Sequence, residues 1–250
     1  MKYIHTPQQS ASGRLLARRL RLRRIRGPID RYPQNAELVL TWGQRPDNFS
    51  DTGKTINHPA AQRAASNKIY AFRMMQDAGV STVPFTLSID EANNWKAHGA
   101  PVVERGTVTG SGGAGIRVVR PGEALRNVQL YTQFVPSVRE YRIHVVGDAV
   151  LPARKVRRNG TEADPFPIRN HSDTWAFQYD IPEKSPVHES VLTLAKKAID
   201  AVDLDFGAVD ILYQGKGIAC VLEINTAPGI EHSVAEEFYV RELQGLVNGR

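Results

Sequence analysis

Two polar side chains near the end of one hydrophobic strand offer the clearest chemistry in the sequence. The stretch "CVLEIN", residues 220–225, begins as a buried strand and then carries Glu223 and Asn225 just before a Pro-Gly turn. Side chains two apart on a strand point to the same face, so this carboxylate and this carboxamide converge. Because an unpaired buried carboxylate is costly, we expect an arginine, a lysine or a metal ion to neutralise it.

A second carboxylate, Asp210, is predicted to join them. It lies in "GAVDILY", and a turn at Gly215–Gly217 connects this stretch to the strand above, so the two form a hairpin with Asp210 beside Glu223. Two carboxylates and a carboxamide are hard oxygen ligands, which suit Mg²⁺ better than zinc. Basic residues on other predicted strands face the same cleft, namely Arg105, Arg142, Arg154 and Lys155. Acids that hold a metal ion, opposed by cations, are what a nucleoside triphosphate site needs.

A glycine-rich stretch adds a second phosphate-binding signal. In "TVTGSGGAGI", residues 107–116, four glycines fall within six residues, between two β-rich stretches. This pattern predicts a flexible hairpin whose backbone amides approach an anion closely. The "GKT" at Gly53–Thr55 is not a P-loop, because Asn48 stands where that motif requires its first glycine.

The elements that position these residues alternate between strands and helices. We expect a strand, helix, strand opening that ends at Gly43, a loop over 44–57, and one helix of about five turns from Pro59 to Gly79. Residues 157–187 read as a long loop that serves as a lid. The other expected elements are a short helix over 90–98, a strand that begins in "APVVERG" at 100–106, strands at 130–135 and on both sides of Gly147-Asp148, a helix over 188–202, and the final hairpin.

Composition describes an ordinary globular chain. Its 250 residues are 41% hydrophobic and 23% charged, and no run of about 18 apolar residues predicts a membrane span. The single cysteine, Cys220, lies in an apolar strand, so no internal disulfide forms and a reducing, cytoplasmic location is expected.

The positive charge is concentrated near the start of the chain. Seven arginines fall between Arg14 and Arg26, and no acidic residue precedes Asp30. A surface helix with Leu16, Leu20 and Ile25 on its apolar stripe is the first interpretation. The alternatives are an arm that binds nucleic acid or another acidic partner, and a targeting segment.

The ordered motifs resemble the ATP-grasp superfamily, above all D-alanine:D-alanine ligases and ribosomal-protein glutamate ligases. The resemblance runs from about Asn57 to Ser233 and is carried by "NHPAAQRAASNK", "PVVERGTVTGSGGAGI", "YTQFVPSVREYRIHV", "LPARKV", "FGAVDIL" and "VLEINTAPG". It implies an α/β (α+β) ATP-grasp fold in which two α+β lobes grip ATP. The expected domains are a short N-terminal α/β lobe, a small lobe with the glycine-rich loop, and a large lobe with the metal site, at 1–56, 57–135 and 136–250.

The resemblance also implies a role for each matching residue. Asp210, Glu223 and Asn225 would bind two Mg²⁺ ions, or Mn²⁺, that clamp the phosphates of ATP. The implied nucleotide contacts are Lys68, Arg105 and Arg142, the loop residues Gly110, Ser111, Gly112 and Gly113, the adenine hinge Gln133, Phe134 and Val135, the ribose-binding Glu140, and Asn170 near the metal. The implied catalytic residues are Arg154 or Lys155, which would face the γ-phosphate or acyl phosphate, and Gly229, whose turn directs backbone amides at the reacting carboxylate.

The reaction implied is ATP-dependent ligation of a carboxylate to an amine of an amino acid, peptide or protein. Two departures from the family pattern indicate a substrate other than D-alanine. D-alanine ligases have an arginine two residues before the metal aspartate, where this sequence has Ala208, and the N-terminal lobe that helps to bind the acceptor is short. The alternatives are an ATP-grasp kinase of a small polyanion, and a nucleic-acid or acidic-protein binder that uses Arg14 to Arg26.

Overall fold

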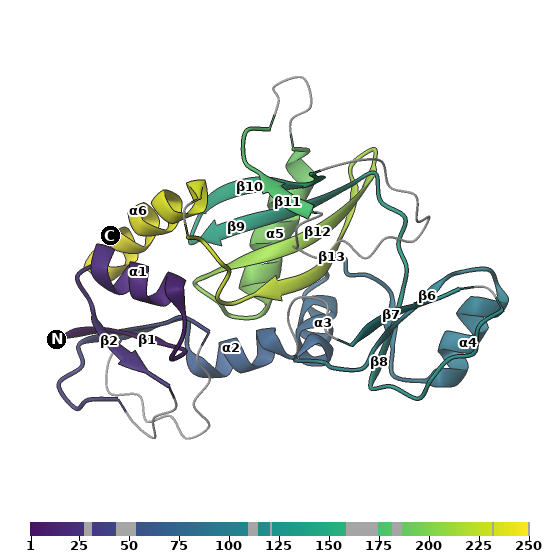
Figure 1. The fold of residues 1–250 in the computed structure, drawn as a ribbon, viewed down its shortest axis with the longest axis horizontal. Coiled ribbons are helices and arrows are strands. Elements are labelled where there is room, and N and C mark those ends of the chain that lie inside the picture. Colours follow the sequence, from purple (N-terminus) through teal and green to yellow (C-terminus); the bar gives the residue numbers. More distant parts are fainter. Residues whose placement is uncertain are drawn as a thin grey trace.

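Three β-sheets, arranged from one end of the molecule to the other, form the framework (Figure 1). The computed structural model describes residues 1–27, 32–43, 54–109, 115–120, 122–158, 175–181, 187–231 and 233–249. In the described part of the chain, no helix combines the length and apolar character needed to cross a bilayer.

The N-terminal lobe is built on a parallel sheet with the strand order β2-β1-β3-β4. Its elements are β1 (Lys2–Thr6), α1 (Ala11–Arg19), β2 (Arg23–Arg26), β3 (Leu38–Thr41) and β4 (Lys54–Ile56). The last helix of the chain, α6 (Val234–Asn248), packs on this lobe, and Phe238 and Leu243 share a core with Ile4 and Leu16.

The basic segment is folded into this lobe, but it is not one helix. Helix α1 ends at Arg19, Arg21 adopts a left-handed backbone with φ 55°, and the chain continues as strand β2. Leu16 and Leu20 are buried as predicted, whereas Ile25 lies on the strand. The predicted 44–57 loop also contains strand β4, which pairs with β3.

The predicted long helix from Pro59 is two helices, α2 (Pro59–Ser66) and α3 (Lys68–Asp77). Asn67 interrupts them with an extended backbone, φ −94° and ψ 111°, and its side chain accepts hydrogen bonds from the Ile69 and Tyr70 amides. Asparagine competes with helix continuation in this way because its side chain caps a new helix. The break turns Lys68 into the first residue of α3.

The small lobe contains an antiparallel sheet with the strand order β5-β8-β6-β7 and helix α4. Its elements are β5 (Phe85–Thr86), α4 (Ile89–Ala97), β6 (Val102–Arg105), β7 (Ile116–Val119) and β8 (Leu130–Gln133). Strands β6 and β7 flank the glycine-rich loop, whose residues Gly110, Ser111, Gly112 and Gly113 lie outside the described residues.

The large lobe contains a five-stranded antiparallel sheet with the order β11-β10-β9-β12-β13. Its elements are β9 (Arg139–Val146), β10 (Ala149–Arg157), β11 (Trp175–Gln178), α5 (Glu189–Ala201), β12 (Phe206–Gly215) and β13 (Ile218–Asn225). Helix α5 covers one face, where Val191 and Ala195 share a core with Ile143, Val209 and Ile211. Strand β11 corrects the prediction of an uninterrupted loop over 157–187. The three sheets fall within the three expected domains, whose exact boundaries stay a prediction.

Candidate functional site

The β12–β13 hairpin places the two carboxylates side by side on the sheet face opposite α5. The strand register pairs Asp210 with Glu223, as the sequence predicted, and also pairs Ala208 with Asn225. On the other side, Asp210 pairs with Arg142 of β9. A register shift between Asp210 and Ile211 lets Val221 face the core while Glu223 stays on the polar face.

Arg142 neutralises Asp210 through a bidentate ion pair. Its Nε and one Nη lie 2.7 Å from the two carboxylate oxygens of Asp210, and both side chains are largely buried. Burial raises the pKa of Asp210, but the charge and hydrogen bonds of Arg142 outweigh it and hold this pKa below its usual value. Asp210 is therefore an anion whose main counterion comes from the neighbouring strand.

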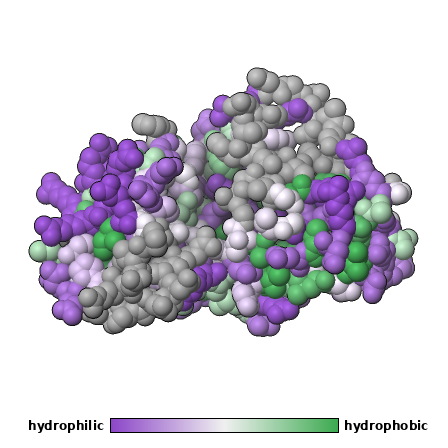
Figure 2. Space-filling view, turned by 60° about the horizontal axis from the view of Figure 1, so that its bottom comes forward, coloured by the Kyte–Doolittle hydropathy of each residue, from purple (hydrophilic) through white to green (hydrophobic). Residues whose placement is uncertain are grey.

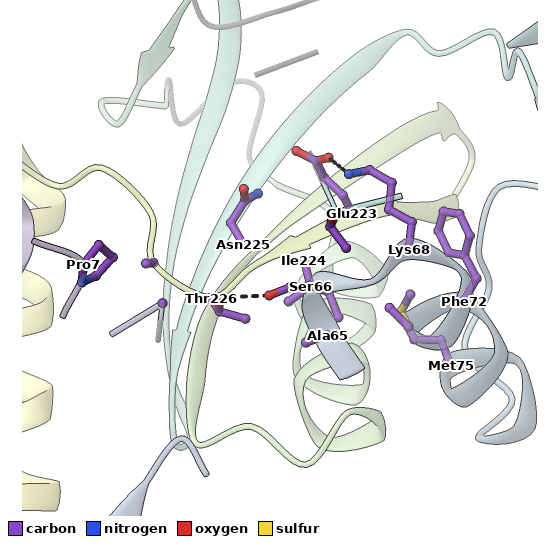
Figure 3. Close-up of a pocket in the computed structure, with 14 residues that line it drawn as sticks. Pro7, Ala65, Ser66, Lys68, Phe72, Met75, Glu223, Ile224, Asn225 and Thr226 are labelled. Carbon is purple, nitrogen blue, oxygen red and sulfur yellow. Dashed lines mark hydrogen bonds and ion pairs between the residues drawn. The ribbon is translucent and has the colours of Figure 1, made fainter. Parts of the chain in front are cut away.

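Lys68 and Glu223 face one another across a pocket (Figure 3). The Lys68 Nζ lies 3.5 Å from the Glu223 Oε2, and Asn225 is on the same side of β13 as Glu223. The Nδ2 of Asn225 is 3.5 Å from the Asp210 Oδ2, which is a weak contact. Lys68, Glu223 and Asn225 thus line one edge of the pocket, and Asp210 lies behind them in contact with Asn225.

The pocket has a volume of about 190 Å³ and joins all three lobes. Pro7 and Gly43 line it from the N-terminal lobe, Thr109 from the small lobe, and Glu223 and Asn225 from the large lobe. Helices α2 and α3, which carry Lys68, form the rest of its wall with Thr226. This volume is below the range typical of ligand sites, so the described pocket admits only a small group.

Of the two basic candidates on β10, Lys155 lies on the acidic face and Arg154 does not. Lys155 Nζ is 2.6 Å from the Glu140 Oε1, whereas Arg154 pairs in register with Tyr141, whose side chain lies in the core under α5. The guanidinium of Arg154 donates to Gln178 at 2.9 Å. The structure therefore does not bring Arg154 together with the other site residues.

Phe177 of β11 completes the cationic side of the site. Its ring lies 4.3 Å from the Arg142 guanidinium carbon and 5.8 Å from the Lys155 Nζ, a geometry that stabilises both cations. The sequence reasoning missed Phe177 because it placed this residue in a lid loop. The short aromatic-rich apolar run in "WAF" was the available signal.

The small lobe contributes a buried arginine. Arg105 is 4% exposed, and its Nε donates to Thr132 Oγ1 at 3.4 Å. Burial lowers the pKa of this guanidinium, and the charge of Glu223 opposes that effect. Arg105 and Glu223 therefore interact across the gap between the lobes.

Of the three hinge residues, only Val135 leaves its backbone N–H without a hydrogen bond in the described part of the chain. The amides of Gln133 and Phe134 donate to the Pro84 and Pro101 carbonyls. Val135 is thus the one of the three predicted hinge residues whose amide is not engaged there, and contact with adenine stays a prediction. Asn170 lies outside the described residues.

The start of α1 meets the turn that follows β13, a contact that the sequence did not indicate. Ser12 Oγ donates to Glu231 Oε1 at 2.6 Å, and the amide of Ile230 lies 3.1 Å from the other carboxylate oxygen of Glu231. Since Ile230 is engaged in this way, Gly229 is the turn residue whose amide has no such partner among the described residues.

Comparisons with known proteins identify the fold. No family model matches the chain. A D-alanine–D-alanine ligase from Chromohalobacter salexigens is 28% identical over 100 residues, a match that covers 39% of this chain and only 32% of that ligase. A solved D-alanine–D-alanine ligase from Bacillus anthracis superimposes with a TM-score of 0.65 and 11% identity, over 100% of this chain and 96% of its own.

Two solved enzymes bound to precursors give the same result. ATP-grasp ligase PsnB, complexed with a variant of its minimal precursor, Mg and ADP, superimposes with a TM-score of 0.67 and 13% identity, over 98% of this chain and 97% of that one. The macrocyclase MdnC from Microcystis aeruginosa, bound with precursor peptide MdnA, gives 0.66 and 13% over 100% of both chains. The chain has the ATP-grasp fold. This confirms the fold predicted from the sequence.

The oxygen donors of this ATP-grasp site fit Mg²⁺. Asp210 and Glu223 offer carboxylate oxygens and Asn225 offers a carboxamide oxygen, the hard ligands that Mg²⁺ prefers. Both Asp210 oxygens accept from Arg142, so ion binding requires that carboxylate to be shared with the arginine. The number of ions and the use of Mn²⁺ stay predictions.

A neutral histidine supports the floor of the ATP-grasp site next to Arg142. His144 is fully buried, and its two ring nitrogens lie 3.4 Å and 3.2 Å from the hydroxyls of Tyr239 and Tyr179. Burial, with the positive charge of Arg142, lowers the pKa of His144 to about 3. His144 therefore positions two tyrosines and carries no charge at neutral pH.

We expect His144 to make the folded state sensitive to mild acid. Its pKa is lower when folded than the value of about 6.5 when unfolded, so the unfolded state binds more protons and stability falls as pH falls below 6.5. Between about pH 7.5 and about pH 5 this costs about 2 kcal/mol. Urea denaturation at both pH values should show that His144→Gln removes this part of the pH dependence, whereas exposed His98→Gln leaves it unchanged. An unaltered pH dependence in His144→Gln would contradict the assignment.

Proposed function

We propose that the protein is an ATP-dependent carboxylate–amine ligase that forms an amide through an acyl phosphate and releases ADP and phosphate. One observation carries the proposal. A single sheet face presents Asp210 and Glu223 side by side, and the basic residues Arg142, Lys68 and Lys155 surround them. The ATP-grasp fold and its ligase neighbours support this reading.

The chemistry follows from the weakness of a carboxylate as an electrophile. Phosphorylation gives it a leaving group, and fixed cations stabilise the charge that develops as phosphoryl groups move. Mg²⁺, when bound, neutralises the phosphates of ATP. In the proposed roles Lys68 and Arg105 hold phosphates, Lys155 and Arg142 face the transferred group, and the Gly229 amide orients the reacting carboxylate.

The substrate is proposed to differ from D-alanine. Ala208 has no charge to offer an intermediate, and it is fully buried beneath the polar face. The guanidinium nearest to Asp210 comes instead from Arg142 on the adjacent strand. The neighbours PsnB and MdnC are described with precursor peptides, which favours a peptide as the molecule that supplies the carboxylate or the amine.

Nucleotide binding is tested first by the melting temperature with and without MgATP. Saturation at a hundred times the dissociation constant adds about 2.7 kcal/mol, which raises the melting temperature by roughly 5 to 10 °C for a chain of this size. We expect this shift with MgATP and a much smaller one with ATP and EDTA. The absence of any shift would overturn the nucleotide site.

The reaction type is tested by product analysis. Incubation with MgATP and candidate acids and amines should release ADP and free phosphate together with an amide. Hydroxylamine added in place of the amine should attack the acyl phosphate, release phosphate and form a hydroxamate. A stable phosphate ester with no free phosphate would show a kinase instead.

A further inference from the structure

Three of the N-terminal arginines form a cluster that the proposed reaction does not use. Burial lowers the pKa of Arg24 of β2, and the nearby positive charges of Arg14 of α1 and Arg26 of β2 lower it further. Arg24 and Arg26 pair in register with Ile4 and Thr6, so they share the sheet face on which α1 packs. The cluster therefore joins the helix to the end of the strand.

The centre of the cluster donates its hydrogen bonds to neutral groups. The Nε of Arg24 donates to Thr6 Oγ1 at 2.7 Å. One Nη lies 2.9, 3.2 and 3.1 Å from the carbonyl oxygens of Pro7, Gln8 and Ser10. Arg24 thus holds the loop between β1 and α1, and no carboxylate of the described residues forms an ion pair with it.

No acidic side chain neutralises the cluster within the described residues. Arg14 and Arg26 are exposed and make no ion pair there, whereas Arg19 of the same helix binds Glu236 and Glu237 of α6. Strongly hydrophilic side chains gather over this end of the molecule, at the left of Figure 2. Like charges held together cost free energy, and an anion from outside the chain would offset that cost.

The position of the cluster connects it to the pocket. It lies at the carboxyl ends of β1 and β2, the edge of an open parallel sheet where ligands bind. Pro7, whose carbonyl accepts from Arg24, also lines the pocket that contains Glu223 and Asn225. Because that pocket holds about 190 Å³, a longer substrate must extend beyond it, and Pro7 is the residue shared by the pocket lining and the loop that Arg24 holds.

We propose that Arg14, Arg24 and Arg26 bind carboxylates of an acidic peptide whose reacting residue enters the pocket. This inference rests on the proposed ligase function and names its substrate class. A nucleic acid is the weaker candidate, because its binding proteins commonly neutralise about 6 to 10 phosphates and this cluster offers three cations.

The test measures peptide binding directly, without ATP turnover. Fluorescence anisotropy follows a fluorescein-labelled oligoglutamate peptide as wild-type protein is added, in parallel with Arg14→Gln/Arg26→Gln. Arg24 is left intact because it holds the loop. Loss of two arginine–carboxylate contacts should weaken binding about tenfold.

The matched control is Arg18→Gln/Arg21→Gln. It removes the same charge from exposed arginines that make no ion pair among the described residues and do not perturb Arg24. We expect its peptide affinity to stay within about twofold of wild type. Equal weakening in both double variants would overturn the cluster as a specific site, and so would a wild type that does not bind the peptide.

A labelled oligothymidylate tests nucleic-acid binding in the same anisotropy assay. Tighter binding of this probe than of the peptide, lost in Arg14→Gln/Arg26→Gln, would also overturn the proposal. The MgATP melting shift is measured on every variant. If that shift is present while peptide binding fails, the substrate inference alone is wrong; if the shift is absent in wild type, the ligase proposal fails independently.

Discussion

Glu223→Gln should lose at least about a hundredfold in ATP turnover, the scale seen when one fixed electrostatic contact to a transition state is removed. The substitution keeps the size of the side chain and removes the negative charge that faces Lys68. Folding should survive, because the Lys68–Glu223 pair is long and partly exposed and contributes about 1 kcal/mol at most. A coupled assay of ADP release measures turnover, and the melting temperature without nucleotide measures whether the fold survives. The MgATP melting shift measures nucleotide binding by the variant.

The matched control for this variant is Glu37→Gln. Glu37 makes its ion pair with the N-terminal amine, and its side chain is 75% exposed. We expect wild-type turnover and a wild-type melting shift from it. Full turnover in Glu223→Gln would contradict the site assignment, and an unfolded Glu223→Gln protein would contradict the small structural role given to this carboxylate.

Arg142→Met should destabilise the fold by about 3 to 5 kcal/mol, the cost of leaving a buried charge without its partner. Asp210 is nearly inaccessible, and Arg142 supplies both of its closest hydrogen bonds. Methionine preserves the packing of the aliphatic stem near Phe177, so the loss reports mainly on the charge. Urea denaturation at neutral pH gives the change in free energy of unfolding.

Two further variants separate charge from packing. Arg142→Met combined with Asp210→Leu replaces the ion pair by apolar groups and should recover most of the lost stability, while activity stays absent. Arg154→Met, on the opposite sheet face with neutral Gln178 as its partner, should cost only about 1 kcal/mol. No recovery in the double variant would show that the uncompensated charge is not the cause.

In the central hairpin, strand geometry predicted that Asp210 and Glu223 pair, but it did not predict the register shift beside them. Residues two apart in "LEIN" share a face, and the turn at Gly215–Gly217 sets Asp210 opposite Glu223. The same period-two reasoning predicted the polar face of β9, although it left open whether that face meets water. The structure shows Glu140 and His144 buried on this face.

The errors arose where a tertiary contact or a local cap outweighs the periodic pattern. The apolar spacing continues through Asn67, but the asparagine side chain caps a new helix there. The arginine- and leucine-rich segment favours helix, but Arg21 interrupts it. The residues that follow pair with the edge of β1 as strand β2. The choice between Arg154 and Lys155 also required the strand register with β9, which the sequence does not contain.

Helix α6 has a consequence for the order in which this chain folds. The first lobe buries Ile4 and Leu16 against Phe238 and Leu243, so its core depends on residues that lie far from them in the sequence. Contacts of such long sequence separation form slowly, because a large loop must close before they can form. The small-lobe sheet packs on α4, which is close to it in sequence, and can assemble while the N-terminal sheet still lacks its cover. The N-terminal sheet therefore reaches its final structure only after α6 has docked.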